Sequence, residues 1–205
     1  MHYLTDGPEE AKQRFLFAHG AGGPMDRPFM TAIARGLAAQ GIRVVRFEFP
    51  YMAARREGSK RGSPDRPAVL LDTWRRVIDE HGGGARVAIG GASMGGRIAS
   101  MLADEAGVRG LVCFGYPFHP PGRPTQLRTA HLETLRTPAL IVQGTRDPFG
   151  TRGEVAAYEL SPSIRIEWLE DGDHSFKPRK ASGFSEADHL ARAAALAAPF
   201  LAGLR

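Results

Sequence analysis

Residues 86–106 read RVAIGGASMGGRIASMLADEA, and this stretch decides the fold. The apolar residues before Gly91 predict a strand, and the residues from Gly95 onward predict an amphipathic helix. Between them lies Ser93, in the pattern Gly-x-Ser-x-Gly. A serine at so sharp a turn has a strained backbone, and the flanking glycines remove side chains that would collide with the strand and the helix. The stretch therefore predicts a strand–turn–helix unit that exposes the Ser93 hydroxyl above a sheet.

Length and composition limit the class of protein. The chain has 205 residues, which suits a single domain over residues 1–205 with a sizeable core. No apolar run approaches transmembrane length, and the N-terminus lacks the apolar core of a signal peptide, so we expect a cytoplasmic protein with no membrane partner. The single cysteine, Cys113, suits a reducing compartment. The net charge is +5, but the arginines are scattered along the chain, so we expect no nucleic-acid partner.

Six predicted strands alternate with helical patterns along the chain. This alternation predicts an α/β fold whose mainly parallel sheet is covered by helices on both faces. Four of the strands are continuously apolar, as central strands are, whereas the second and sixth alternate and are expected at the edges. The predicted spatial order is therefore 2-1-3-4-5-6, with the serine strand near the point where the order reverses. The strands are expected at residues 12–19, 42–49, 86–90, 110–114, 139–142 and 164–168.

Local signals complete this outline. Residues 1–11 are polar and acidic and predict an arm or a short outer strand. Asp26 is expected to cap the helix that follows it. Residues 50–67 are rich in Pro, Gly and Arg and predict a long loop. Ser185 begins a capping box for the last helix, which Pro199 is expected to kink or interrupt.

Two residues downstream are placed to activate the serine. A serine hydroxyl is a poor nucleophile near neutral pH, so it needs a base and the base needs an orienting acid. Asp147 follows the fifth predicted strand and His174 follows the sixth, the chain order expected after such a turn. We expect Ser93 to be the nucleophile, His174 the general base and acid, and Asp147 the orienting group. Asp171 and Asp173 are rivals for the last role, but they are close to His174 in sequence.

A second glycine-rich loop, residues 19–24, follows the first predicted strand. The oxyanion hole is expected to use the backbone N–H of Met94 together with one N–H from this loop. Ala21 is the preferred donor and Gly22 the alternative. His19 either supports the loop or is simply a packed histidine at a strand end.

The chain resembles the α/β-hydrolase superfamily from about residue 12 to its end. It is similar to the small lidless branch near the dienelactone hydrolases, and more closely to a group of small bacterial serine hydrolases with eukaryotic relatives, one of them in a chromatin complex. The matching strings are His19-Gly20-Ala21-Gly22-Gly23, Phe47-Glu48-Phe49-Pro50-Tyr51-Met52, Gly90-Gly91-Ala92-Ser93-Met94-Gly95-Gly96-Arg97, Gly115-Tyr116-Pro117-Phe118-His119-Pro120-Pro121-Gly122, Gly144-Thr145-Arg146-Asp147-Pro148-Phe149-Gly150 and Gly172-Asp173-His174.

The resemblance implies a minimal α/β-hydrolase fold and a triad of Ser93, Asp147 and His174. Dienelactone hydrolases carry a cysteine nucleophile, so Ser93 argues against their substrate. We expect a hydrolase that cleaves small-molecule carboxylic esters or thioesters through an acyl-enzyme, with no metal and no organic cofactor. The alternatives are a non-catalytic binding or scaffold protein of the same fold, and an acyltransferase or peptidase with the same triad. The oligomeric state stays open.

The remaining loops supply candidate pocket residues. Residues 115–137 are too few for an inserted lid domain, so Tyr116, Phe118 and His119 are expected to line an open cleft together with Gly22. Packing within the loop is the alternative for each of the three side chains. The basic loop 55–66 attracts an acidic substrate or is simply a solvated loop, and charge runs usually have the second role.

Overall fold

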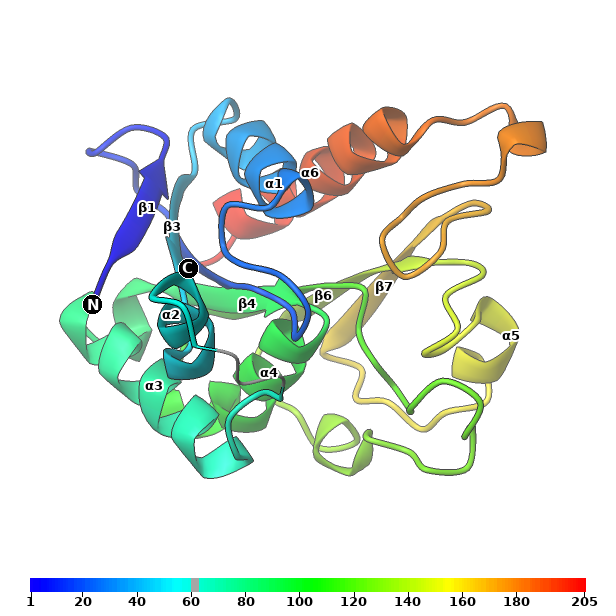
Figure 1. The fold of residues 1–205 in the computed structure, drawn as a ribbon, viewed down its shortest axis with the longest axis horizontal. Coiled ribbons are helices and arrows are strands. Elements are labelled where there is room, and N and C mark those ends of the chain that lie inside the picture. Colours follow the sequence, from blue (N-terminus) through cyan, green and yellow to red (C-terminus); the bar gives the residue numbers. More distant parts are fainter. Residues whose placement is uncertain (60–62) are drawn as a thin grey trace.

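A seven-stranded sheet runs through the middle of the computed structural model, in which residues 1–59 and 63–205 are described (Figure 1). The strand order is β1-β3-β2-β4-β5-β6-β7. Strand β1 is antiparallel to β3, and the other five pairings are parallel. The strands are β1 (Tyr3–Asp6), β2 (Arg14–Ala18), β3 (Arg43–Phe47), β4 (Ala88–Ala92), β5 (Gly110–Phe114), β6 (Ala139–Gly144) and β7 (Ile164–Leu169).

The predicted order of the six parallel strands is confirmed, and β1 is a seventh strand outside them. Strand β3, the second predicted strand, is therefore not an edge strand, because β1 pairs along it. Arg46 contributes to the alternating pattern that made this strand look half-exposed, yet its side chain is buried. Its guanidinium lies 2.8 Å from the Asp6 carboxylate and donates to the Met25 carbonyl oxygen at 2.8 Å. The pattern thus arose from a paired buried cation and not from contact with solvent.

Helices cover both faces of the sheet (Figure 1). Helices α1 and α6 pack side by side on one face, and α2, α3 and α4 cover the other. Strand β2 shows how the strands serve both cores: Phe15 and Phe17 face α1 and α6, whereas Leu16 and Ala18 face the opposite core. The helices are α1 (Pro28–Ala38), α2 (Pro50–Arg56), α3 (Pro67–Glu80), α4 (Met94–Ala106), α5 (Arg152–Val155) and α6 (Glu186–Ala202), with 3₁₀ turns at Gly84–Arg86, Ala130–Leu132 and Lys180–Ser182. No described helix has both the length and the apolar character needed to cross a membrane.

The structure differs from the local predictions at three points. Asp26 does not cap α1: the N-cap is Arg27, without a side-chain cap, and Asp26 is bonded to Arg56 instead. The segment 50–67 begins with helix α2, whose first residue is Pro50, a position where the missing N–H costs nothing. Pro199 does not interrupt α6, which extends to Ala202. The capping box at the start of α6 is present as predicted.

The loops that follow the C-terminal ends of the parallel strands all lie at one edge of the sheet. Loops after β2, β4, β6 and β7 therefore meet there, as expected for a ligand site in an open α/β sheet. Residues 115–138, between β5 and β6, hold only a short 3₁₀ turn, so no lid domain is inserted at this point.

Candidate active site

Ser93 lies between β4 and α4, at φ 50° and ψ −118°. This is a positive φ that a residue with a side chain adopts at a cost. The turn is as tight as the glycine pattern predicts: a Cβ on Gly91 would lie 2.6 Å from the Gly95 carbonyl carbon, and a Cβ on Gly95 would lie 2.5 Å from the His19 carbonyl oxygen. The backbone N–H of Ser93 donates to the Phe114 carbonyl oxygen at 3.0 Å, which ties the turn to β5.

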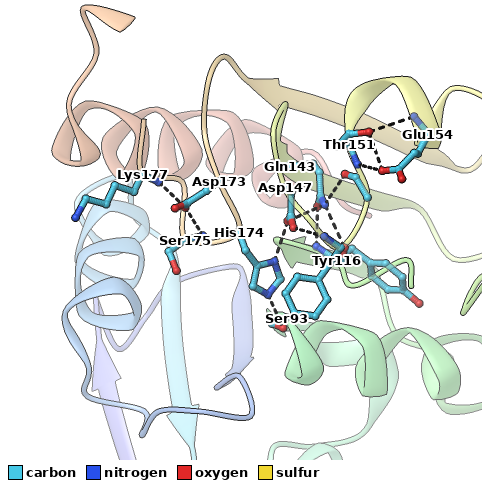
Figure 2. Close-up of polar contacts among 12 residues, drawn as sticks. Ser93, Tyr116, Gln143, Asp147, Thr151, Glu154, Asp173, His174, Ser175 and Lys177 are labelled. Atoms are coloured by element: carbon cyan, nitrogen blue, oxygen red, sulfur yellow. Dashed lines mark hydrogen bonds and ion pairs between the residues drawn. The ribbon is translucent and has the colours of Figure 1, made fainter. Parts of the chain in front are cut away.

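The three residues expected to form a triad lie in one hydrogen-bonded chain (Figure 2). Ser93 Oγ is 2.8 Å from His174 Nε2, and His174 Nδ1 is 2.8 Å from Asp147 Oδ2. Because Asp147 accepts from Nδ1–H, Nε2 is left to accept from the serine hydroxyl. The Asp147 carboxylate is fully buried, whereas 22 % of the His174 side chain is exposed. The arrangement has the geometry of a general base held in one tautomer beside a nucleophile.

Asp147 is held by two further donors. Gln143 Nε2 donates to Oδ2 at 2.9 Å, and the Phe149 N–H donates to Oδ1 at 2.8 Å (Figure 2). The Gln143 side chain is buried, and its own carbonyl oxygen accepts from the Tyr116 N–H at 2.7 Å. Sequence reasoning missed Gln143, although it is a polar residue in the otherwise apolar strand β6. A polar amide at the end of an apolar strand is the signal that could have identified it, because a buried amide needs hydrogen-bond partners.

The two rival aspartates shape the loop that carries His174. Asp171 accepts from the Arg179 N–H and Nε, each at 2.7 Å, and lies 2.9 Å from Arg146. These bonds hold the pKa of Asp171 below its usual range, with the Arg179 side chain as the main cause. Asp173 accepts from the N–H groups of Ser175 and Lys177 (Figure 2). Both carboxylates are therefore used within the loop, and Asp147 holds the imidazole.

Two side chains hold the glycine-rich loop after β2. His19, which is buried, donates from Nδ1 to the Gly20 carbonyl oxygen at 2.7 Å and accepts from the Phe49 N–H at 3.1 Å. The Tyr51 hydroxyl donates to the Ala21 carbonyl oxygen at 3.0 Å. In a trans peptide the N–H points opposite to the preceding carbonyl, so the N–H groups of Ala21 and Gly22 point away from His19 and Tyr51.

These amides lie beside the serine. Ala21 and Gly22 both line the depression that contains Ser93 and His174. Met94 begins α4, so no carbonyl within the helix accepts from its N–H. The helix N-terminus also favours negative charge at this point. The backbone amides of Met94, Ala21 and Gly22 are therefore the candidate donors beside the Ser93 hydroxyl.

The depression around Ser93 has a volume of about 270 Å³ and is partly apolar. It is lined by Gly20, Ala21, Gly22, Arg27, Phe29, Ala92, Ser93, Phe114, Phe149, His174 and Ser175. Across the described residues, no cluster of three or more His, Cys, Asp or Glu side chains is arranged to hold a metal ion.

Three of the expected pocket residues lie elsewhere. Tyr116, Phe118 and His119 are all buried, and none lines the depression. The rings of Tyr116 and Phe118 contact each other at 4.8 Å and belong to the apolar core beneath the sheet. His119 bonds to the Pro120 carbonyl, and its Nε2 lies 3.6 Å from the Glu154 carboxylate. The loop after β5 turns toward the core, so these side chains are buried there and do not line the depression at Ser93.

A second serine–histidine pair lies outside this site. Ser100 Oγ is 2.8 Å from His131 Nε2 and 2.7 Å from the Arg97 carbonyl oxygen. The serine is buried, and no carboxylate is bonded to His131 among the described residues. Burial, together with the charge of Arg97, lowers the pKa of His131. This pair therefore lacks both the acid and the access that the Ser93 cluster has.

The basic segment 55–66 is only partly described, because Lys60 and Arg61 lie outside the described residues. Its first part belongs to α2, where Arg56 contacts the carboxylates of Glu48 and Asp26, each at 2.7 Å. Arg55 lies over the Tyr51 ring at 5.2 Å. Neither arginine lines the depression at Ser93.

Comparison with known proteins identifies the family and the fold. A family model described as an alpha/beta hydrolase domain matches residues 11–202. An alpha-beta serine hydrolase homologue from Coxiella burnetii has a similar structure, with 20 % identity, a TM-score of 0.71, and coverage of 97 % of this chain and 90 % of that one. A serine hydrolase without a lid from Xanthomonas campestris is 21 % identical with a TM-score of 0.70, and the match covers 99 % of this chain and 90 % of that one. Dienelactone hydrolase from Anabaena variabilis is 22 % identical with a TM-score of 0.70, and the match covers 99 % of this chain and 92 % of that one. At these identities the structural likeness concerns the fold.

Proposed function

We propose that this chain, which belongs to the alpha/beta hydrolase domain family, is a serine hydrolase. It cleaves carboxylic ester or thioester bonds through an acyl-enzyme. The observation that carries the proposal is the chain of two 2.8 Å hydrogen bonds from Ser93 through His174 to Asp147. These two hydrogen bonds give the weak nucleophile Ser93 a base, His174, and a carboxylate that stabilises the imidazolium, Asp147.

The reaction follows from these positions. Ser93 Oγ attacks the acyl carbon while His174 Nε2 takes the hydroxyl proton, and the carbonyl π electrons move onto the oxygen. The tetrahedral oxyanion accepts hydrogen bonds from Met94 N–H and Ala21 N–H, with Gly22 as the alternative donor. When the intermediate collapses, the C–O or C–S bond breaks and His174 gives its proton to the leaving group. Water then attacks the acyl-serine in the same way, releasing the acid and restoring the Ser93 hydroxyl.

The direct test compares two serines of this chain. Hydrolysis of 4-nitrophenyl butyrate is measured for the wild type, Ser93→Ala and Ser100→Ala. We expect Ser93→Ala to lower kcat by at least about 10³-fold, whereas Ser100→Ala keeps most of the activity. A serine-directed phosphonate should add once to the wild type and not to Ser93→Ala, as read by intact mass. Undiminished activity in Ser93→Ala would refute the proposal.

Other outcomes identify the alternatives. A folded protein that neither turns over any activated ester nor reacts with the phosphonate would be a binding or scaffold protein. Product formation on an added alcohol or amine acceptor would indicate acyl transfer, and cleavage of peptides would indicate a peptidase. The proposed substrate is a small-molecule acyl ester used in the cytoplasm, with neither a cofactor nor a nucleic-acid partner required by the reaction.

A further inference from the structure

The depression at Ser93 contains one permanent positive charge. Arg27 lies in its wall, and the only other titratable side chain among the described lining residues is His174. No carboxylate belongs to that lining. Arginine remains protonated at all working pH values, so an incoming ester meets this charge whatever the state of the imidazole.

Arg27 has no counter-ion among the described residues, and the carboxylates of Asp26 and Glu48 pair with another arginine. Asp26, its neighbour in sequence, lies 2.7 Å from the Arg56 guanidinium, and Glu48 lies 2.7 Å from the same group. The bond to Arg56 holds the pKa of Asp26 below its usual range, so the carboxylate is charged and paired at neutral pH. Arg56, and not Arg27, is therefore the ion-pair partner of these two carboxylates.

The Arg27 side chain lies against Gly23, in the glycine-rich loop after β2. A Cβ on Gly23 would lie 2.8 Å from Arg27 Cδ and 3.2 Å from Nη1. The stem and the guanidinium therefore lie directly against the backbone of the loop that follows β2. A residue with a side chain at position 23 would displace the guanidinium.

The element that carries Arg27 adds to the positive potential. Arg27 is the N-cap of α1, and no side chain caps this end of the helix. The first turn of α1 contains no acidic residue, so no carboxylate within the helix offsets the partial positive charge of its N-terminus. Phe29 in the same turn contributes an apolar wall, and Phe114 and Phe149 contribute others.

We propose that the substrate of this site is an ester that also carries an anionic group, above all a carboxylate, which Arg27 binds while Ser93 attacks the ester carbonyl. This inference rests on the proposed serine hydrolase function and adds the class of substrate to it. A guanidinium binds a carboxylate through two parallel hydrogen bonds, which fixes orientation as well as charge. The aromatic walls accommodate the carbon chain between the two groups, so half-esters of dicarboxylic acids fit the site.

Two nitrophenyl esters of matched size test the inference. The 4-nitrophenyl half-ester of adipic acid carries a terminal carboxylate, and the corresponding adipamic ester carries a neutral amide of the same shape. We expect kcat/KM of the wild type to be about tenfold higher for the adipate than for the adipamate. This is the lower end of the range expected for a hydrogen bond between charged groups, because Arg27 is exposed. This preference should shrink as NaCl is raised from 20 to 500 mM.

The variants separate charge from position. Arg27→Gln should lower kcat/KM for the adipate about tenfold and leave the adipamate within about twofold. Arg27→Lys should give an intermediate value, because lysine keeps the charge without the planar fork. Gly23→Ala should weaken the adipate preference while the charge is still present. Arg35→Gln is the matched control, since Arg35 is an exposed arginine at the other end of α1.

The outcomes distinguish the two levels of the proposal. Equal losses for both members of each ester pair in Arg27→Gln would overturn the substrate inference and leave the hydrolase function intact. So would a wild type with Ser93-dependent turnover that prefers neither the adipate over the adipamate nor 4-acetoxybenzoate over 4-acetoxybenzamide. A wild type without Ser93-dependent turnover of either ester would overturn both. A parallel pair with the carboxylate or amide on the leaving phenol, 4-acetoxybenzoate and 4-acetoxybenzamide, shows which side of the ester faces Arg27. An Arg27-dependent preference in either pair supports the inference.

Discussion

The phenol of Tyr51 lies 3.0 Å from the carbonyl oxygen of Ala21 and donates to it. Tyr51 belongs to α2, whereas Ala21 belongs to the loop after β2, so this bond joins two elements at the edge of the site. By holding the Ala21 carbonyl, this bond also orients the Gly22 N–H, which lies on the opposite side of the same peptide. His19 acts in the same way one peptide earlier, through the Gly20 carbonyl.

The Tyr51 hydroxyl also lies 3.4 Å from the Gly20 carbonyl oxygen, so it contacts the peptides of both candidate donors. Removing this hydroxyl should therefore affect turnover more than binding. We expect Tyr51→Phe to lower kcat for 4-nitrophenyl butyrate about 2- to 10-fold, the value of one neutral hydrogen bond, with little change in KM. Tyr158→Phe is the matched control, because the buried Tyr158 hydroxyl has no hydrogen-bond partner among residues 1–59 and 63–205. A Tyr51→Phe enzyme with wild-type kcat, or one in which only KM changes, would show that this contact does not orient the oxyanion donors.

Helix α2 also shows why part of the site escapes sequence reasoning. Its residues lie in a segment rich in Pro, Gly and Arg, a composition typical of loops. The helix forms because Pro50 occupies its first position and because Tyr51 and Met52 are buried in the core. Tertiary packing of this kind overrides local composition.

The amide of Gln143 should matter for catalysis through Asp147. Gln143→Leu removes a donor 2.9 Å from Asp147 Oδ2 in a site without exposure to solvent. We expect kcat for an activated ester to fall about tenfold or more, with phosphonate labelling slowed in parallel, because hydrogen bonds to charged groups are worth about 1.5–3 kcal/mol.

A change in the neighbouring turn separates this effect from simple loss of stability. Thr151 and Glu154 form a capping box at the start of α5, and neither contacts Asp147 (Figure 2). Thr151→Val should lower the free energy of unfolding by about 1 kcal/mol while kcat stays near that of the wild type. If Gln143→Leu and Thr151→Val lower kcat equally, Gln143 is a structural residue only.

Burial of His19 predicts a pH dependence of stability. Burial is the main cause that lowers the pKa of His19 from 6.5, and the charges of Arg56 and Arg55 act in the same direction, against the Gly20 carbonyl and Glu48. Below pH 6.5 the unfolded chain binds a proton that the folded chain does not, so the free energy of unfolding falls as the pH falls. Protonation would also place an N–H of the imidazolium against the Phe49 N–H, which now donates to this ring.

Urea unfolding at pH 7.5, 6.5 and 5.5 measures this effect. We expect the wild type to lose stability across this range and His19→Gln to lose less, since it has no ionisable group at this position. His131 contributes with the same sign in both proteins, so it cancels in the comparison. Identical pH slopes for the two proteins would contradict the assignment.

The sequence was most informative where chain order and strand ends constrain position. Asp147 and His174 follow the ends of two parallel strands, so both reach the edge that carries Ser93, and the observed bonds join all three. Tyr116 and Phe118 also follow a strand, but whether an aromatic residue lines a cleft or packs inward depends on how the whole loop turns. Arg27 and Gln143 were missed because their importance comes from what surrounds them in space.

The glycines around Ser93 give the last prediction. A Cβ on Gly95 would meet the carbonyl oxygens of His19 and Ala18 at 2.5 and 2.7 Å, both in the backbone of adjoining chain segments. Gly95→Ala should therefore lower the free energy of unfolding by about 1–3 kcal/mol and slow phosphonate labelling of Ser93. Gly153→Ala is the opposite case, because Gly153 lies in α5 with open space around its Cβ position. It should leave labelling unchanged and stabilise the protein by about 0.5–1 kcal/mol. A Gly95→Ala protein that matches Gly153→Ala in urea midpoint and labelling rate would show that the turn tolerates a side chain, and with it that the close backbone approach is not what holds Ser93 in place.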